Sequence, residues 1–174
     1  MAPAPSDLPG PPPLRARPHR RPQRTASRPM HAVLYRSRAR PGLVAADLNA
    51  IVGAARAYNG PAGLTGVLLY GELDWVPGAP GEFVQWIEGP ERAVAEAMAR
   101  VRADRRHSGV EVLASGPVAE VAGAARRGRS RPSPDRPSPD RSGRLFPTWS
   151  MGLVRLAELP ATAEGFLEAA GRWR

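Results

Sequence analysis

The uneven distribution of apolar residues limits where this chain can build a core. Nearly all of its large aliphatic and aromatic residues fall within residues 31–120 and 145–170. Residues 1–29 and 121–144 are rich in Pro and Arg instead, and residues 131–140 repeat the pentapeptide R-P-S-P-D. Proline is excluded from helix interiors and central strands, and segments with so little apolar surface cannot offset the entropy cost of ordering. We therefore expect one domain, with a disordered N-terminal tail over residues 1–29 and a disordered insert over residues 121–144.

Within the apolar part, strand and helix patterns alternate along the chain. Short alternating runs predict strands, and apolar residues at three- and four-residue spacing predict helices that end near Gly and Pro. Their order indicates the ferredoxin-like arrangement βαββαβ(β), an α+β fold. Two helices should cover one sheet face, and a short C-terminal helix should cover part of the other. The expected strands are residues 31–37, 65–70, 83–88, 110–114 and 146–154, and the expected helices run from Val44 to Asn59, from Pro90 through Val101 and from Ala161 to Arg172.

The positive charge lies outside the predicted core. The formal net charge is +9 at pH 7, but residues 1–30 and 121–144 each contribute +5, so the remainder is close to neutral. Arg-rich arms of this kind can contact the phosphates of nucleic acid. Solvated tails explain the same charge without any partner, and we favour that interpretation over a nucleic-acid partner.

The residue inventory excludes several kinds of site. The chain has no Cys, which rules out disulfide bonds, a thiol nucleophile and a thiolate metal site. It has no Gly-rich phosphate loop, paired-His spacing or nucleophile elbow, so we expect neither a metal site nor a catalytic triad. The N-terminus lacks the apolar centre of a secretory signal, and no run is long enough to span a bilayer. The sequence therefore predicts a cytoplasmic protein that does not contact a membrane.

Two polar residues occupy strand centres where aliphatic residues are the norm. Tyr35 and Gln85 alternate in register with Val33 and Ile87, which assigns them to the sheet face under the two helices. A buried Gln without partners costs about 1–3 kcal/mol. Gln85 meets this need if it simply bonds the Tyr35 hydroxyl inside an ordinary core. Together with Asn59 at the end of the first helix, the same residues form a polar triangle suited to a planar heterocycle with donors and acceptors along one edge.

Five short segments help to decide between an ordinary core and a site for a heterocycle. In chain order they are Y-R-S from Tyr35, Asn59 followed by L-T-G at residues 64–66, F-V-Q-W-I-E-G at residues 83–89, D-R-R-H at residues 104–107 and W-S-M-G at residues 149–152. Each segment alone is weak evidence for any family, but the ordered series closely resembles the BLUF family of flavin-based blue-light sensors. The resemblance places a flavin-binding domain at residues 30–154 and leaves residues 155–174 as a C-terminal helical cap.

The resemblance implies a flavin held between the two helices, FAD most often, with FMN or riboflavin tolerated. Tyr35 matches the family's redox-active tyrosine, and Gln85 matches its switching glutamine. Asn59 matches the asparagine that bonds the pyrimidine edge of the ring. Trp149 and Met151 match the fifth-strand pair whose packing changes with the signal.

Four further residues fit family contacts at the other end of the ring. Arg100 and Asp104 fit the polar contacts to the far side of the pyrimidine, whereas Arg106 and His107 fit the mouth of the cofactor site. The alternative for these four is a solvated helix end with an ion pair between residues four apart.

The implied activity is a light-driven rearrangement of hydrogen bonds among Tyr35, Gln85 and flavin, with no net reaction and hence no enzyme. Few residues follow Met151, so we expect the signal to pass to a separate partner protein or through a homo-oligomer. The sequence departs from the family in the long hairpin connection from Gly71 to Glu82 and in the insert before Trp149. Three alternatives stay open: a photochemically silent binding module, a nucleic-acid binder acting through the Arg-rich arms, and a small hydrolase on the same fold.

Overall fold

The computed structural model describes residues 29–72, 81–126 and 139–170, which form one five-stranded sheet with helices on both faces. In chain order the elements are β1 (His31–Ala39), α1 (Ala45–Asn59), β2 (Thr65–Glu72), β3 (Glu82–Gly89), α2 (Glu91–Ala103), β4 (His107–Pro117), α3 (Val118–Arg126), β5 (Trp149–Arg155), the 3-10 helix η1 (Leu156–Glu158) and α4 (Ala163–Ala170). The predicted α+β fold of βαββαβ order is confirmed, with β5 added at one edge.

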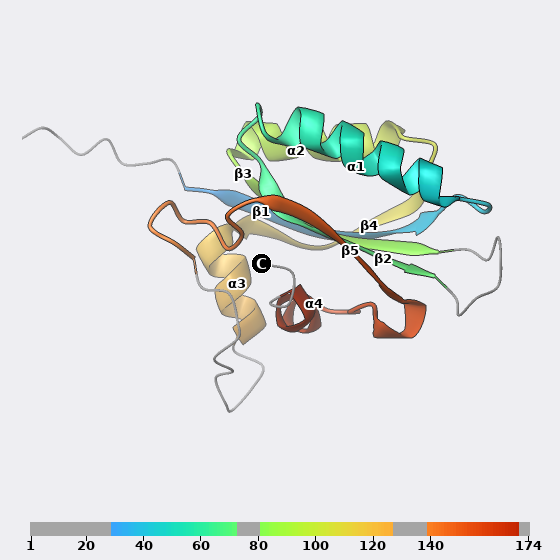
Figure 1. Cartoon of the computed structure of the whole chain (residues 1–174). Helices are drawn as coiled ribbons and strands as arrows, with labels where there is room; N and C mark the ends of the chain where they lie inside the picture. The colour runs from blue at the N-terminus through green and yellow to red at the C-terminus, as the bar shows by residue number, and fades with distance from the viewer. Residues whose placement is uncertain (1–28, 73–80, 127–138, 171–174) are drawn as a thin grey trace, which may run out of the picture.

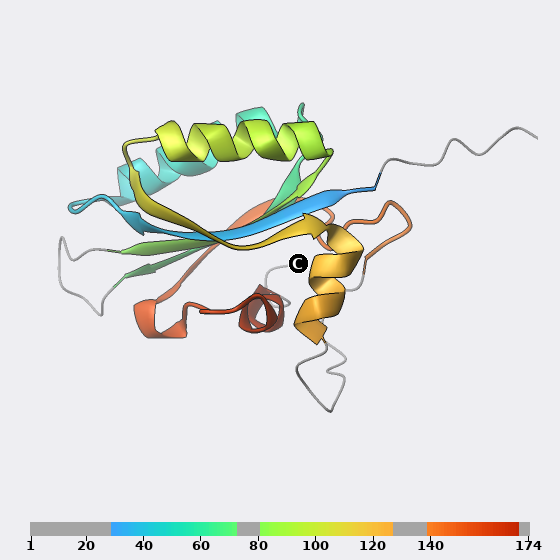
Figure 2. The same ribbon diagram turned by 180° about the vertical axis from the view of Figure 1, so that it is seen from behind.

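The sheet has the strand order β4-β1-β3-β2-β5. The pairs β1–β4, β1–β3 and β2–β3 are antiparallel, and β5 pairs with β2 in parallel. Figure 1 shows α1 and α2 side by side above the sheet, with α3 and α4 below it, and the reverse view in Figure 2 agrees. The interior strands of the sheet therefore have helices on both faces.

Strand alternation divides the core between the two faces. On the face below, Leu34 and Trp86 pack with Phe146 and with Phe166 of α4 in one cluster that also includes α3. On the face above, the buried residues form two separate clusters, one containing Val94 and Met98 of α2 and one containing Ile51 of α1. The C-terminal helix thus covers the face for which it was predicted, and α1 and α2 lie over two different parts of the other face.

Gly66 shows why the L-T-G segment needs a glycine. Its φ is +146°, and a Cβ atom at this position would lie 2.0 Å from the carbonyl oxygen of Trp86 on the neighbouring strand. Such an approach excludes every side chain. The glycine lets β2 pair closely with β3 and also accept β5 on its other side, where the Gly66 amide donates to the Thr148 carbonyl.

The assignment of residues 121–144 to a disordered insert was wrong at both ends. At its end, residues 139–144 are described, and Arg144 donates to Thr65 and to the Gly63 carbonyl. Residues 121–126 belong to α3, and Val121, Ala122 and Ala125 are buried in the lower core. These three residues repeat at helical spacing from Val118, so they bury an apolar stripe that offsets the cost of ordering. The tandem Pro repeat begins beyond this helix and lies outside the described residues, except for residues 139 and 140.

Several element boundaries also differ from the predicted ones. β4 runs from His107 to Pro117 and is longer than predicted, whereas β5 starts at Trp149, after Pro147. The N-terminal tail through residue 28 and Trp75 in the long connection lie outside the described residues. Among the helices of the described ranges, none is long and apolar enough to cross a membrane.

Candidate functional site

A cavity of ≈ 280 Å³ lies between α1, α2 and the sheet, where the two upper clusters fail to meet. Its volume is close to the lower end of the range for small-molecule sites, about 300–1,000 Å³. Apolar walls come from Ile51 and Ala55 of α1, Leu68 and Ile87 of the sheet, and Val101 of α2. Of the nine residues singled out from the sequence, the structure brings eight to this cavity: Tyr35, Asn59, Gln85, Arg100, Asp104, Arg106, His107 and Trp149.

Tyr35 and Gln85 form the floor of the cavity. The two residues are cross-strand partners on β1 and β3, and Tyr35 Oη donates a hydrogen bond of 2.6 Å to Gln85 Oε1. Tyr35 is 0% exposed and Gln85 is 5% exposed. Burial raises the pKa of the Tyr35 phenol far above its usual value, and the nearby Asp104 carboxylate adds to that shift. The phenol therefore stays protonated at every physiological pH.

Asn59 lies at the last position of α1, with its side chain at the cavity. The residue is 5% exposed and lines the cavity, and no described residue hydrogen-bonds its side-chain amide, whose atoms stay accessible there. A buried amide has two donors and an acceptor to satisfy. The Nε1 atom of Trp149, which is buried at the same cavity, likewise lacks a partner within the described ranges. These unmet groups fit a ligand that presents both acceptors and donors, as the pyrimidine edge of a flavin does.

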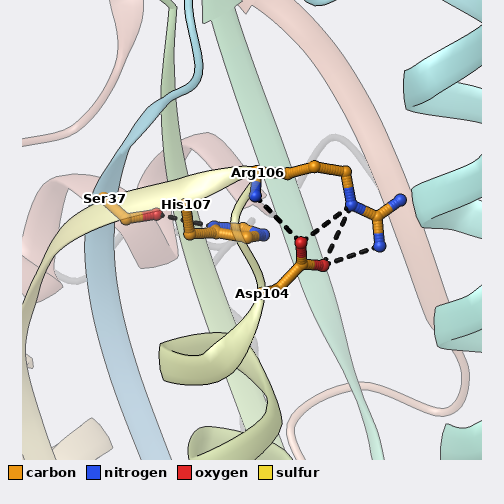
Figure 3. A network of polar contacts seen from close by, with 4 residues as sticks. All are labelled: Ser37, Asp104, Arg106 and His107. Atoms are coloured by element: carbon orange, nitrogen blue, oxygen red, sulfur yellow. Dashed lines mark hydrogen bonds and ion pairs between the residues drawn. The ribbon is translucent and has the colours of Figure 1, made fainter.

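The turn between α2 and β4 carries a compact polar network (Figure 3). Arg106 donates from its backbone amide and its guanidinium to the Asp104 carboxylate, with a shortest contact of 2.6 Å from Nη2 to Oδ2. These bonds hold the pKa of Asp104 below its usual range. On β1, the Ser37 hydroxyl lies 2.9 Å from His107 Nδ1. Burial lowers the pKa of His107, so the imidazole is neutral near pH 7.

The alternative of an ion pair between Arg100 and Asp104, which are four residues apart, is not found in the structure. Asp104 pairs with Arg106, two residues away, because it caps the C-terminal end of α2 and the chain turns back there. Arg100 instead places its guanidinium 3.8 Å from the centre of the Tyr58 ring. Such a cation–π contact bridges α2 to α1 beside the cavity. Tyr58 was missed by the sequence reasoning, and its only sequence signal is that it precedes Asn59. Ser37 was part of the Y-R-S segment but was given no role of its own.

Trp149 and Met151, the pair on β5, differ in their position relative to the cavity. Trp149 lines the cavity, whereas Met151 does not; Met151 packs against the cluster that contains Phe83 and Leu68. Leu68 is the β2 partner of Met151 and lines the cavity itself. Met151 is therefore one residue layer away from any ligand in the cavity.

The arrangement is suited to binding rather than to hydrolysis. Apolar side chains line the walls of the cavity, the Tyr35 phenol and the Gln85 amide lie at its floor, and guanidinium groups lie at its rim. Groups of three or more His, Asp or Glu side chains that could hold a metal ion do not occur among the described residues. A flat heteroaromatic ring with a polar edge matches these walls and this rim.

Comparison with known proteins gives the same family from independent data. The family model described as "BLUF: Sensors of blue-light using FAD" matches residues 30–122. The photoactivated adenylate cyclase subunit beta of Euglena longa is 32% identical over 98 residues, which are 56% of this chain and 10% of that protein. The corresponding subunit of Euglena gracilis is 32% identical over 96 residues. The chain thus spans about a tenth of the length of these curated relatives.

Two solved structures match over most of their length. The dark-state structure of the BLUF protein BlrB is 28% identical, with a TM-score of 0.51, and the match covers 83% of each chain. The BLUF domain of BlrP1 is 26% identical, with a TM-score of 0.51, and the match covers 83% of this chain and 75% of that one. Because the family match extends over more than half of the chain and includes β1 to β4 around the cavity, this protein belongs to the BLUF family of blue-light sensors that use flavin.

Proposed function

We propose that this chain is a blue-light photoreceptor that binds FAD without a covalent bond in the cavity between α1 and α2. The observation that carries the proposal is the 2.6 Å hydrogen bond from Tyr35 to Gln85, buried at the floor of that cavity in a BLUF fold. A core Gln that only needed a partner would leave no cavity beside it. The open space makes the amide available to a ligand as well as to Tyr35.

The proposed contacts follow from the groups left free at the cavity. The Asn59 amide bonds the pyrimidine edge of the ring, and the Gln85 amide bonds the ring beside it. Ile51 of α1 and Ile87 of β3 line the cavity, and we expect them to pack against the ring. Arg100 brings positive charge to the rim, whereas the charge of Arg106 is offset by its ion pair with Asp104; the remaining positive charge favours a cofactor with phosphate groups. Riboflavin, FMN and FAD share the ring, and we propose FAD because the family description names it.

The proposed switch requires a proton donor and a side chain whose hydrogen-bond donor and acceptor can exchange places. A bound flavin supplies an excited state that oxidises a nearby phenol. Tyr35 keeps its proton in the dark because burial raises the pKa of its phenol. Its Oη atom therefore has a proton to give up when the phenol loses an electron. Gln85 Oε1 would take up this proton while the Gln85 amide passes one of its own to the flavin that received the electron, and the electron and proton would then return to Tyr35. An amide carries a donor and an acceptor at one tip, so Gln85 can return with the two roles exchanged, which neither Leu nor Glu could do.

Signal output in this proposal passes to a separate protein or to another copy of the chain. Trp149 is the residue of β5 that shares the cavity with Gln85, and Met151 packs behind it. A rearrangement of the Gln85 amide would change the contacts of the Trp149 and Met151 side chains. No bond of a substrate is made or broken at the site, so the proposed activity is sensing and not catalysis.

An absorption spectrum before and after blue light tests the proposal. We expect the purified protein to show a flavin spectrum that shifts slightly to the red under light and recovers in the dark. The variant Gln85→Leu should keep the flavin and lose the shift. A protein that is colourless and cannot be reconstituted with FAD would contradict the proposal and favour a silent binding module.

A further inference from the structure

Glu88 is a carboxylate at the centre of the protein that the cavity does not use. It lies on β3 with 0% exposure, and its side chain is on the lower face of the sheet, opposite Gln85. Burying an ionised carboxylate is costly unless hydrogen bonds replace its water. Burial raises the pKa of the Glu88 carboxyl, and four hydrogen bonds oppose this shift. The burial of the Glu88 carboxylate therefore calls for a structural explanation.

Each carboxylate oxygen of Glu88 accepts one side-chain and one backbone donor. Oε1 accepts from Thr65 Oγ1 at 3.2 Å and from the Phe146 amide at 2.7 Å. Oε2 accepts from Trp86 Nε1 at 3.0 Å and from the Leu145 amide at 3.0 Å. Three separate parts of the chain thus meet at one carboxylate: β2, β3 and the segment just before β5.

Arg144 attaches the same segment to β2 a second time. Its Nη1 donates to Thr65 Oγ1 at 2.8 Å, and its Nη2 donates to the Gly63 carbonyl at 2.8 Å. Thr65 therefore accepts from Arg144 and donates to Glu88. We call Glu88, Thr65 and Arg144 the β5 clasp. Figure 1 shows the clasped segment, in orange, leading into β5 at the end of the sheet where α3 begins.

The clasp sets where Trp149 can lie. Phe146 is three residues before Trp149, and β5 begins its pairing with β2 at Gly66 and Trp149. Three extended residues reach only about 10 Å, so the clasp restricts the start of β5 closely. The Trp149 indole has no hydrogen-bond partner of its own among the described residues. Its place at the cavity is therefore determined by the backbone of β5 and by packing.

We propose that Glu88 is a positioning residue of the light switch, because its carboxylate ties β3, which carries Gln85, to the start of β5, which carries Trp149. The inference rests on the proposed function of this site. Gln85 and Glu88 lie three residues apart on one strand, one toward the cavity and one toward the clasp. A change at Gln85 that moves β3 is then transmitted to β5 through the clasp as well as through the cavity.

Hydrogen exchange of the full chain, measured with bound FAD in the dark and under blue light, tests this role. Glu88→Gln keeps the size of the side chain but places an NH2 group against donors, so part of the clasp is lost. Exchange at residues 149–155 should rise at least tenfold in the dark, while exchange in β1 changes little. The variant should keep the red shift and show a smaller light–dark difference at residues 149–155 than the wild type, because only the route through the cavity remains intact. Glu91→Gln, an exposed acid on α2, is the matched control and should behave as the wild type.

The outcomes separate the two proposals. A wild type without a red shift contradicts the proposed function, whereas the dark exchange of β5 in Glu88→Gln still reports on the clasp. A red-shifting Glu88→Gln variant with an unchanged light–dark difference at β5 overturns the positioning role, and so does a wild type with no such difference. If Glu88→Gln does not fold, Thr65→Val removes the hydroxyl that joins Arg144 to Glu88 and leaves the carboxylate in place. It should reduce the same light–dark difference, and an unchanged difference in that variant overturns the inference.

Discussion

Tyr35 and Gln85 are direct cross-strand partners, and the Tyr35 hydroxyl donates to the Gln85 amide oxygen at 2.6 Å. The antiparallel register of β1 and β3 holds the two side chains opposite each other on the face under α1 and α2. Cross-strand neighbours lie close enough for such a bond without any loop or helix to position them. The contact is therefore a property of two neighbouring interior strands of the sheet.

Tyr35→Phe should abolish the light-induced red shift and leave flavin bound, because the ring packing remains while the proton donor is gone. The buried Gln85 oxygen also loses its donor, which should lower the free energy of unfolding by about 1–3 kcal/mol. Light–dark difference spectra and urea unfolding measure the two effects. Tyr70→Phe is the matched control, since its hydroxyl bonds Glu72 away from the cavity and the variant should keep the red shift. A red shift of full size in Tyr35→Phe would exclude Tyr35 from the switch.

Asn59→Ala should weaken flavin binding about tenfold, which corresponds to the loss of about 1.4 kcal/mol from one or two hydrogen bonds. The amide has no partner within the described protein, so its removal costs the protein little and the complex more. Titration of the flavin-free protein, followed by flavin fluorescence, gives the dissociation constant. Asn49→Ala, on an exposed part of the same helix, should bind flavin as the wild type does. Equal affinity in both variants would show that Asn59 does not contact the ring.

Stability should fall as the pH drops through the range in which histidine titrates. Burial lowers the pKa of His107 below its usual 6.5; Arg106 adds to this shift and Asp104 opposes it. The unfolded chain takes up a proton as the pH falls through 6.5 while folded His107 resists it, so the free energy of unfolding decreases toward acid. Urea unfolding between about pH 7.5 and pH 5.5 measures this slope. His107→Gln should reduce the slope, and an identical slope in both proteins would contradict the assignment.

Phe166→Ala should lower the free energy of unfolding by about 3–5 kcal/mol, the usual cost of truncating a buried aromatic side chain. Phe166 is 0% exposed on α4 and packs in the lower core with α3 and Phe146. Leu153→Ala provides the control, because Leu153 is 65% exposed on the edge strand β5 and its loss should change stability little. Chemical denaturation measures the free energy of unfolding of both variants. Equal stabilities would mean that α4 does not hold the lower face of the sheet.

The sequence alone determined the order of the five strands and of the helices α1, α2 and α4, together with the sheet face to which the residues of β1 and β3 belong. Alternation with period two assigned Tyr35 and Gln85 to the helical face and Leu34 and Trp86 to the other, because neighbouring side chains on a strand point to opposite sides. The helix α3 was missed although Val118, Val121, Ala122 and Ala125 have helical spacing, since the Pro and Arg that follow dominated the interpretation of that segment. The pattern for that helix was present in the sequence.

Only the tertiary structure decided which polar groups meet. Asp104 bonds Arg106 because the chain reverses at the end of α2, and Arg100 reaches Tyr58 because α1 and α2 pack side by side. Glu88 takes two of its hydrogen bonds from backbone amides 57 and 58 residues further along the chain, which no local spacing could indicate. Local periodicity reports the conformation of one segment, whereas such contacts depend on how distant segments approach each other, and that is determined by the packing of the whole sheet and its helices.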